Sequence, residues 1–315
     1  MSASSSPSRP LPRTLTLILC LAVLASLAAP LHPALDSIAH FRLHLGALLA
    51  LASLWAFARG LRRLAAGAMC VVLAAMVSTA PFLPGVATTG AAAAPDPLRV
   101  IQFNARSDNG EIGRAAAFIR AMKPDVILVE EARDGPGQIA EQLDGDYPVR
   151  VSCLFLEWEG GLLVFSRWPA IAGEPALCSA DSRLAAVRLL VRGTPVTFAS
   201  LHLKWPWPVN QAGHIDRLSP LLAALPHPLV LGGDFNAAPW SHAVDRVAGL
   251  TQTRVVPGYR PTWLPLTAPD ALRPLTGLPI DHVLVSGGIR IHAIRTGPSV
   301  GSDHLPVIAD LVLRE

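Results

Sequence analysis

The chain has 315 residues, 51% of them hydrophobic, and its mean hydropathy of +0.41 is high for a soluble protein. Its formal charge of +3 belongs to one end, because residues 1–94 contain six Arg, no Lys and one acidic residue, Asp36. The remaining 20 of 26 basic and 22 of 23 acidic residues give the rest of the chain a charge of −2. This C-terminal part is therefore not the basic body expected of a strong general nucleic-acid binder.

The N-terminal third predicts a membrane anchor. Residues 1–14 are rich in Ser and Pro and are expected to form a positively charged cytoplasmic tail. Apolar runs follow at 15–31, 43–58 and 64–83. A helix needs roughly 20 apolar residues, and at least about 17, to cross the hydrocarbon core of a bilayer. We therefore expect about three transmembrane helices over residues 15–83.

Arginines indicate the orientation of this anchor. Most of them precede the first run or separate the second run from the third: Arg9, Arg13, Arg59, Arg62 and Arg63. The loop between the first two runs has a single arginine, Arg42. The positive-inside rule then places the tail and the Arg-rich loop in the cytoplasm, and the C-terminal part on the outer face. The alternative is a signal peptide cleaved near residues 26–28, which leaves two more apolar runs to bury.

The C-terminal two thirds predicts a mostly β domain. Residues 84–97 are rich in Ala, Gly and Thr and predict a linker. Strand-like apolar runs follow at 98–103, 126–129, 161–165, 184–191, 196–203, 229–231, 280–285 and 307–313. Helical spacing is found at 112–122, 139–143 and 212–225. Because helices and strands do not alternate strictly, residues 98–315 predict an α+β sandwich.

The four cysteines include no Cys-x-x-Cys pair, so a thiolate zinc site is not expected. Cys20 and Cys70 lie in apolar runs, where cysteine behaves as a small hydrophobe. Cys153 and Cys178 can form a disulfide if the domain is extracytoplasmic, or they can stay reduced. The sequence leaves both alternatives open, because it does not give the distance between them.

Polar or ionisable residues stand at the ends of several strand-like runs. The set comprises Asn104, Glu130, His202, Asp234, Asn236, Asp281, Asp303 and His304. A lone Asn or Asp in such a position is usually a turn former, and a lone His usually a structural residue. Together, these side chains can point into one shared cleft whose geometry the strands fix.

In these segments the chain resembles the endonuclease/exonuclease/phosphatase superfamily of DNase I-like proteins. The matching pieces follow the family's order: Phe103-Asn104, residues 124–130, Ser200-Leu201-His202-Leu203, Gly233-Asp234-Phe235-Asn236, Ile280-Asp281-His282-Val283 and Gly301-Ser302-Asp303-His304-Leu305-Pro306. The resemblance covers roughly residues 98–313 and implies a four-layer α/β/β/α sandwich. Three positions depart from the family pattern: Ser200 where Thr is usual, Val129 where Gln is common, and His282 where Tyr is frequent.

The anchor resembles that of a bacterial subgroup of the same superfamily. This resemblance implies a multi-pass protein of the bacterial inner (plasma) membrane, with its catalytic domain on the extracytoplasmic side.

The oxygen-bearing side chains of the set predict a divalent-cation site. A phosphodiester resists hydrolysis because its negative charge repels nucleophiles, and a hard cation offsets that charge. Mg²⁺ needs only one or two carboxylates besides water and substrate. We expect Glu130 as the first ligand, with Asn104 and Asp303 beside it. A set of oxygen ligands favours Mg²⁺, or Mn²⁺, over Zn²⁺.

The resemblance also implies catalytic roles. His304 would be the general base, and Asp281 would hold its imidazole in the useful tautomer. Asp234 and Asn236 are two residues apart, so on an extended segment they face the same way and would orient the attacking water. His202 would contact the phosphate from the other side or protonate the leaving group.

Three functions are compatible with these features. The first is a membrane-tethered, metal-dependent phosphodiesterase of nuclease type. The second is a phospholipid or inositol-phosphate phosphoesterase at the membrane surface, favoured by the anchor and by the low Lys content of the domain, Lys123 and Lys204. The third is a non-catalytic membrane-tethered binding module, which predicts that a polar residue is lost from one of the motifs.

The segment of Trp205 and Trp207 has two interpretations. It is either a rigid structural loop or a contact to substrate or to the membrane interface, where Trp is favoured. The sequence predicts the membrane and a phosphate-ester substrate, nucleic acid or phospholipid, as partners, and indicates no protein partner.

Overall fold

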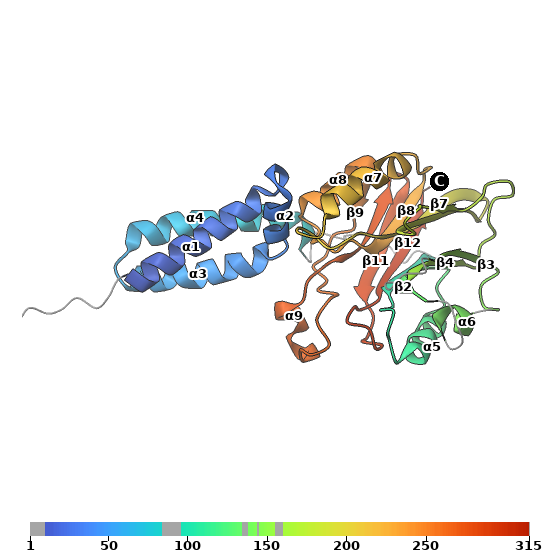
Figure 1. The fold of residues 1–315 in the computed structure, drawn as a ribbon, viewed down its shortest axis with the longest axis horizontal. Helices are drawn as coiled ribbons and strands as arrows, with labels where there is room; N and C mark the ends of the chain where they lie inside the picture. The colour runs from blue at the N-terminus through green and yellow to red at the C-terminus, as the bar shows by residue number, and fades with distance from the viewer. Residues whose placement is uncertain (1–9, 84–95, 134–137, 144, 155–159, 315) are drawn as a thin grey trace, which may run out of the picture.

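A computed structural model of the chain describes residues 10–83, 96–133, 138–143, 145–154 and 160–314. In Figure 1 the N-terminal helices, in blue, form an elongated bundle that meets one end of a β-sandwich built by the rest of the chain. Most of the predicted linker, residues 84–95, lies outside the described residues.

The bundle consists of three long helices with short elements at the end nearest the sandwich. In chain order these are α1 (Pro10–Leu27), η1 (Ala29–Leu31), α2 (Pro33–Ala39), α3 (Arg42–Ala58), α4 (Arg62–Thr79) and η2 (Ala80–Phe82). The buried Arg42 guanidinium donates hydrogen bonds to Ser26 in the last turn of α1 and to Ser78 in the last turn of α4. A cation at helix C-terminal ends is favourable, so Arg42 ties the three helices together.

The outer surface of this bundle is apolar. Sixteen large hydrophobic side chains between Leu11 and Val77 are exposed, whereas the helices of a soluble bundle expose polar faces. Two helices, Pro10–Leu27 and Arg62–Phe82, are long and apolar enough to cross a membrane. A third span exists only if α2 and α3, which are bent by 68° at their junction, count as one. Helix α1 begins within the expected tail, at Pro10.

Two six-stranded sheets form the sandwich. The first has the order β11-β12-β1-β2-β4-β3, and the second β5-β6-β7-β8-β10-β9. The first sheet contains β1 (Leu98–Asn104), β2 (Val126–Ala132), β3 (Val149–Cys153), β4 (Gly161–Ser166), β11 (Ile289–Thr296) and β12 (Val307–Leu313). The second contains β5 (Leu177–Cys178), β6 (Leu184–Val191), β7 (Thr194–His202), β8 (Leu229–Asp234), β9 (Thr253–Val255) and β10 (Asp281–Ser286).

Among the described strands, parallel pairing is confined to those that carry candidate site residues at or near their carboxyl ends. Strand β1 pairs parallel with β2, and β7 with β8, whereas the other described pairs are antiparallel. The carboxyl ends of parallel neighbours lie at the same sheet edge, so each pair delivers two polar side chains to one place.

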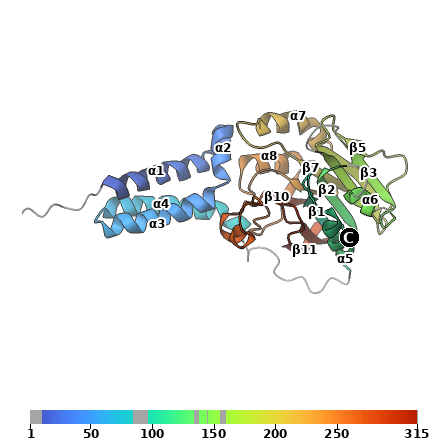
Figure 2. The same ribbon diagram turned by 60° about the horizontal axis from the view of Figure 1, so that its bottom comes forward.

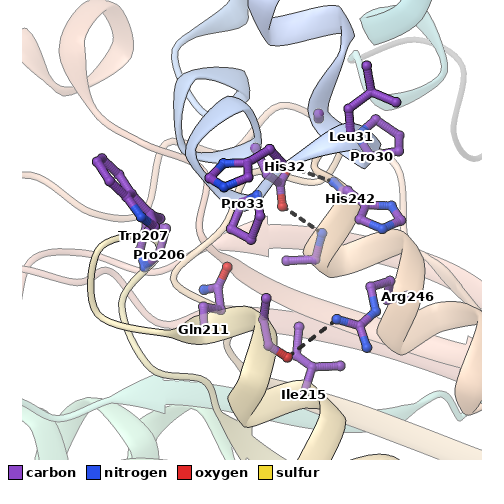
Figure 3. Close-up of a pocket in the computed structure, with 14 residues that line it drawn as sticks. Pro30, Leu31, His32, Pro33, Pro206, Trp207, Gln211, Ile215, His242 and Arg246 are labelled. Carbon is purple, nitrogen blue, oxygen red and sulfur yellow. Dashed lines mark hydrogen bonds between the residues drawn. The ribbon is translucent and has the colours of Figure 1, made fainter.

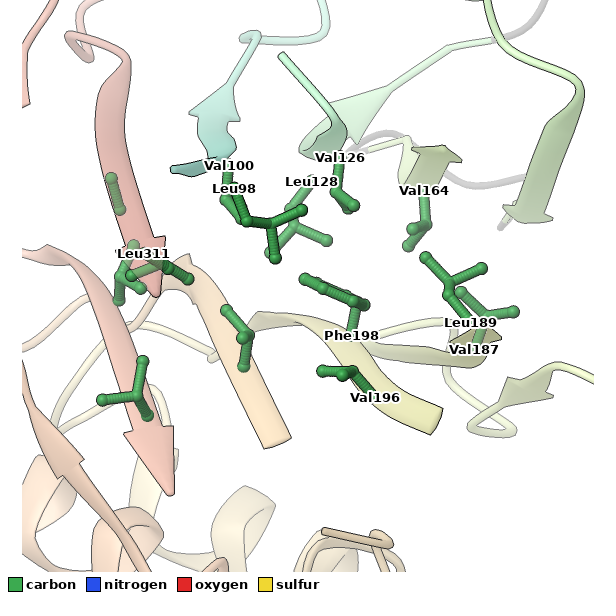
Figure 4. Close-up of a cluster of buried hydrophobic side chains, with 14 of the residues drawn as sticks. Leu98, Val100, Val126, Leu128, Val164, Val187, Leu189, Val196, Phe198 and Leu311 are labelled. Atoms are coloured by element: carbon green, nitrogen blue, oxygen red, sulfur yellow. The ribbon is translucent and has the colours of Figure 1, made fainter. Parts of the chain in front are cut away.

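Apolar cores hold four layers together. The core between the sheets includes Leu128, Val164 and Phe198 (Figure 4). A second core joins the outer face of the first sheet to its helices, and a third does the same for the second sheet. These helices are α5 (Ile112–Met122) and α6 (Ile139–Leu143) on one side, and α7 (Gln211–Ala223) and α8 (His242–Leu250) on the other. The prediction of an α+β sandwich is confirmed.

Several elements are absent from the sequence prediction. They are β3, β5, α8, β9, β11 and the short helices η3 (Asp270–Leu272) and α9 (Arg273–Thr276). Strand β11 is an edge strand with a bulge between Ile291 and Ala293, so its side chains form no continuous apolar run. Helix α8 has only nine residues, and its N-cap is Ser241. No run of turn-forming residues before Ser241 marks the start of this short helix in the sequence.

A disulfide joins Cys153 at the end of β3 to Cys178 at the end of β5. It links the edge strands of the two sheets and closes a loop with a sequence separation of 25. Of the two alternatives that the sequence leaves open, the structure contains the bonded one.

Removing this bond is expected to destabilise the sandwich. Replacing both cysteines by Ser, Cys153→Ser with Cys178→Ser, should lower the free energy of unfolding of the domain by about 3 kcal/mol, because the unfolded chain regains the entropy of the open loop. Urea unfolding of the oxidised chain measures this difference. Cys20→Ser, in α1, is the matched control and should leave the transition unchanged; equal stability of the double variant and the wild type would contradict the prediction.

Candidate active site

Strand pairing brings the predicted residues to one edge of the sandwich. Asn104, the last residue of β1, lies opposite Glu130 in the register with β2. Asp234, the last residue of β8, lies opposite His202 on one side and Asp281 on the other. Gly233 makes this close approach possible, because a side chain there would collide with the Leu201 carbonyl of β7. The two sheets thus contribute to a single site.

Asp234 is the centre of a buried acid–histidine group. Its carboxylate lies 3.7 Å from His304 Nε2, and His304 Nδ1 lies 2.9 Å from Asp281 Oδ2. All three residues are at most 4% exposed. Because the Asp281 carboxylate accepts from Nδ1, the Nε2 atom of His304 is the one directed at the centre of the site.

Burial controls the charge of this group. Desolvation raises the pKa of Asp234 above its ordinary value, against the opposing effect of His304. Desolvation by itself would lower the pKa of His304, but the Asp281 and Asp234 carboxylates outweigh it and raise that pKa. The raised pKa favours the imidazolium form of His304, and an imidazolium cannot accept a proton. A general-base role for His304 requires that another cation offset the carboxylates.

A second group shares Asp234 with the first. Ligand atoms of Glu131, His202 and Asp234 lie within 4.8 Å of one another, as do those of Asp234, Asp281 and His304. Asn104 Nδ2 donates to Glu131 Oε1 and to Asp234 Oδ2, each at 3.0 Å, and so bridges two carboxylates. The Asn104 amide oxygen accepts from the Arg106 N–H, so ligation through that oxygen requires the amide to turn over.

Glu131, rather than Glu130, contributes the carboxylate of β2 to this group. Strand β2 has a register shift between Val129 and Ala132, and Glu131 has a φ of 53°. Such a bulge redirects a side chain, and bulges are frequent next to active sites. The family commonly has Gln directly before its metal-binding Glu. When Glu131 is taken as that residue, the position of the Gln is occupied by Glu130 and not by Val129.

Glu130 lies behind the site in a buried hydrogen-bond network. Its carboxylate accepts from Ser200 Oγ at 2.5 Å and from Gln102 Nε2 at 2.7 Å. Gln102 Nε2 also donates to Asp281 Oδ1 at 3.0 Å, so the network supports the Asp281–His304 pair from the interior. Complete burial raises the pKa of Glu130 well above its ordinary value. The expectation that Glu130 is the first cation ligand does not fit this position.

The remaining predicted residues lie beside the two groups. Asn236 donates its Nδ2 to the Leu203 carbonyl, and its buried Oδ1 has no partner among the described residues. Asp303 accepts from Trp263 Nε1 at 2.9 Å and belongs to neither group. The motif residues are therefore brought together, with Asp303 at the margin.

Arg183 is a site residue that the sequence analysis missed. Its Nη1 lies 3.0 Å from His202 Nδ1, and because a guanidinium can only donate, Nδ1 must be the acceptor. The His202 proton then resides on Nε2, the nitrogen that faces Glu131 and Asp234. Burial, reinforced by the Arg183 charge, lowers the pKa of His202, which keeps its ring neutral. No strand-end pattern marks Arg183, because it precedes β6 instead of following a strand.

These residues fit a hard divalent cation. Two buried carboxylates, those of Asp234 and Asp281, and the partly exposed carboxylate of Glu131 lie in two ligand groups that share Asp234. Desolvation raises the pKa of Asp234, so a cation beside it would be favourable. The unpartnered Asn236 Oδ1 and the carboxylates supply oxygen donors, which Mg²⁺ and Mn²⁺ prefer.

The fold and the site together define a two-sheet α+β domain of the phosphoester-hydrolysing class. A family model described as the endonuclease/exonuclease/phosphatase family matches residues 101–304, and the chain belongs to this family. Among curated protein sequences, none is similar enough to count as a relative.

Several solved structures have a fold similar to that of the sandwich. An endonuclease/exonuclease/phosphatase from Beutenbergia cavernae is 23% identical with a TM-score of 0.53, covering 70% of this chain and 72% of its own. A 3′ phosphatase from Neisseria, bound to a product DNA hairpin, is 18% identical with a TM-score of 0.54, covering 68% and 99%. An AP endonuclease from Archaeoglobus fulgidus is 16% identical with a TM-score of 0.53, covering 69% and 99%. These similarities establish the fold of the sandwich.

The two adjacent glutamates provide a matched test of cation binding. Glu131→Gln should weaken Mn²⁺ binding by about tenfold or more, because it removes a charged ligand, whereas Glu130→Gln should leave it nearly unchanged. Isothermal titration of the full chain in detergent with Mn²⁺ measures both. The reverse order of effects would return the ligand role to Glu130.

Proposed function

We propose that the chain is a membrane-tethered, divalent-metal-dependent phosphoesterase, of phosphodiesterase or nuclease type. The observation that carries this proposal is the sharing of Asp234 between two groups of potential ligands, one with Glu131 and His202 and one with Asp281 and His304. One buried carboxylate thereby connects a cation-binding half of the site to a proton-transfer half.

Mg²⁺ or Mn²⁺ is the proposed cofactor. Glu131 and Asp234 would hold it, with Asn104 alongside after its amide turns over and Asp303 as a further carboxylate nearby. When bound, the cation would neutralise phosphate charge and stabilise the negative charge that develops during hydrolysis.

The chain's own residues divide the remaining work. Asp281 fixes the His304 ring so that Nε2 can take a proton from an attacking water. His202, held as the Nε2–H tautomer by Arg183, can donate to a phosphate oxygen or to the leaving group. Asp234 and Asn236 are directed at the same space and would orient the water.

The polar residues of all the motifs are present in this site, which argues against the non-catalytic binding module. The site also contains Arg183, whose guanidinium adds positive charge next to the carboxylates. The proposed hydrolysis requires each of these groups. A module that only binds would not require the hydrogen bond between Asp281 and His304.

Three observations support an extracytoplasmic location at a bacterial inner membrane. Three of the arginines at the far end of the helices, Arg13, Arg62 and Arg63, line one surface hollow at the α3–α4 turn. The sandwich lies at the opposite end of the bundle (Figure 1). The positive-inside rule places the arginine end in the cytoplasm, and the Cys153–Cys178 disulfide suits an oxidising compartment.

Loss of the proposed base is expected to slow turnover strongly. His304→Ala should lower kcat for a bis-aryl phosphate with Mg²⁺ by roughly 10²- to 10⁴-fold, the range of general acid–base catalysis. EDTA should remove the wild-type activity. His292→Ala, on the edge strand β11, is the control and should retain it. Wild-type turnover by the His304 variant would refute the assigned role.

The proposed topology predicts opposite behaviour of two fusions. Alkaline phosphatase, which is active only outside the cytoplasm, should be active when fused after residue 315. It should be inactive when fused after Leu61, in the arginine-rich turn. Activity in the second fusion alone would place the sandwich in the cytoplasm.

A further inference from the structure

Exposed apolar side chains of the sandwich are concentrated on two loops. Seven large hydrophobic residues are exposed in its described part, and one of them, Leu190, lies on strand β6. The other six form what we call the apolar rim: Trp205, Trp207, Val209, Leu266, Leu272 and Leu275. Their exposed fractions range from 43% to 72%. Soluble monomers rarely collect such side chains in one region without a partner.

Both loops border the active site. The first follows β7 directly after His202, and the second ends where β10 begins at Asp281. Trp205 of the first loop packs edge-to-face on Trp263 of the second, with ring centroids 5.8 Å apart. The backbones of Trp263 and His304 form an isolated antiparallel β-bridge. The two loops that carry the rim are therefore joined to each other and to the site through Trp263.

Both loops also face the anchor. Ser37 of α2 donates to the Trp207 carbonyl at 3.2 Å, and the backbone of Leu275 lies against His44 of α3. In Figure 1, α9 lies on the side of the sandwich that faces the bundle. Figure 3 shows Pro206 and Trp207 beside His32 and Pro33, around a cavity of about 220 Å³ between the anchor and the sandwich.

The anchor is attached to the sandwich by buried contacts that fix this orientation. The Asp36 carboxylate accepts from the N–H groups of His242 and Ala243, at 2.7 and 2.9 Å, in the first turn of α8. Trp240 Nε1 donates to the Ala39 carbonyl at 2.7 Å. In both overall views α2 lies between the long helices and the sandwich (Figure 2). A carboxylate at a helix N-terminus is stabilising, so Asp36 strengthens the attachment of α2 to the sandwich at the end where the rim also contacts α2 and α3.

The chemistry of the rim matches a bilayer interface. Trp is enriched where hydrocarbon meets headgroups, and Leu can enter the acyl region. Residues 204–210 and 264–276 contain Lys204, Asp270 and Arg273 as their charged residues, so the rim carries no excess of negative charge that anionic headgroups would repel. The rim adjoins helices that also expose many apolar side chains. The environment that would cover both surfaces is a lipid bilayer.

We propose that the apolar rim rests in the outer surface of the membrane and that the substrate of the adjoining site is a phosphoester of a lipid in the same leaflet. This inference rests on the proposed phosphoesterase function and names its substrate class. A lipid headgroup beside the rim would reach the site without leaving the interface, whereas a polynucleotide would have to enter between the rim and the headgroups.

Contact with lipid is tested by fluorescence, independently of activity. The full chain is reconstituted in vesicles of phosphatidylcholine brominated near the glycerol end of its acyl chains, because bromine quenches nearby Trp. Trp207→Phe should remove a quenchable component that the wild type has. Trp168→Phe, which follows β4 and packs against the core between the sheets, should not. An unchanged quenched fraction in the Trp207 variant would overturn the proposed contact.

The substrate class is tested by two variants and two kinds of substrate. Vesicles of phosphatidylethanolamine, phosphatidylglycerol, phosphatidic acid and sphingomyelin are followed by ³¹P NMR, with a soluble bis-aryl phosphate and single-stranded DNA in parallel. The rim variant Leu272→Ser with Leu275→Ser should lower lipid turnover by about tenfold or more and leave the soluble ester unchanged. Leu190→Ser should affect neither.

The outcomes separate the two proposals. Hydrolysis of DNA without any lipid would overturn the lipid inference and leave the phosphoesterase proposal intact. Equal lipid turnover by the rim variant and the wild type would also overturn it. Absence of hydrolysis on every substrate would refute the phosphoesterase function and with it the substrate class.

Discussion

The site depends on the burial of more negative charge than the protein itself neutralises. Asp234 and Asp281 lie at adjacent strand ends with Glu131 beside them, and His304 and Arg183 are the cationic groups in contact with this region. Isolated buried carboxylates are costly, and their cost is reflected in the raised pKa of Asp234. A divalent cation held by Glu131 and Asp234 would relieve this cost and would let His304 act as a base. In the proposed mechanism, cofactor binding and proton transfer would therefore follow from the same electrostatic arrangement.

The sequence predicted the sandwich and the proximity of most of the candidate site residues, because both follow from strand ends. Each apolar run had to become a buried strand, and the polar residue after it had to lie where that strand ends at the edge of the sheet. Glu131 was missed because a bulge changes the alternation of β2, and no sequence pattern distinguishes two adjacent glutamates. Arg183 was missed because it precedes its strand. The edge strand β11 and helix α8 lack the continuous apolar pattern on which the other predictions rested.

The N-terminal helix bundle is joined to the sandwich by specific contacts in this structure. The single acidic residue of the bundle, Asp36, caps α8 of the sandwich, and Trp240 donates to the Ala39 carbonyl at the same junction. A flexible linker alone would let the site turn freely, whereas these contacts give the site one orientation relative to the apolar helices. Exposed Trp and Leu side chains are concentrated on the loops at this end of the sandwich. A fixed orientation would keep these side chains on the side that faces the bundle, where Trp is favoured if that side meets a membrane interface.

The most direct test of the account is the location of a bound cation. Crystals of the full chain grown with Mn²⁺ and measured for anomalous scattering should show a peak bonded to the carboxylates of Glu131 and Asp234, at the roughly 2.0–2.2 Å typical of such ligands. A peak at Glu130, or binding confined to exposed carboxylates away from Asp234, would contradict the central claim that this buried cluster is a cation site.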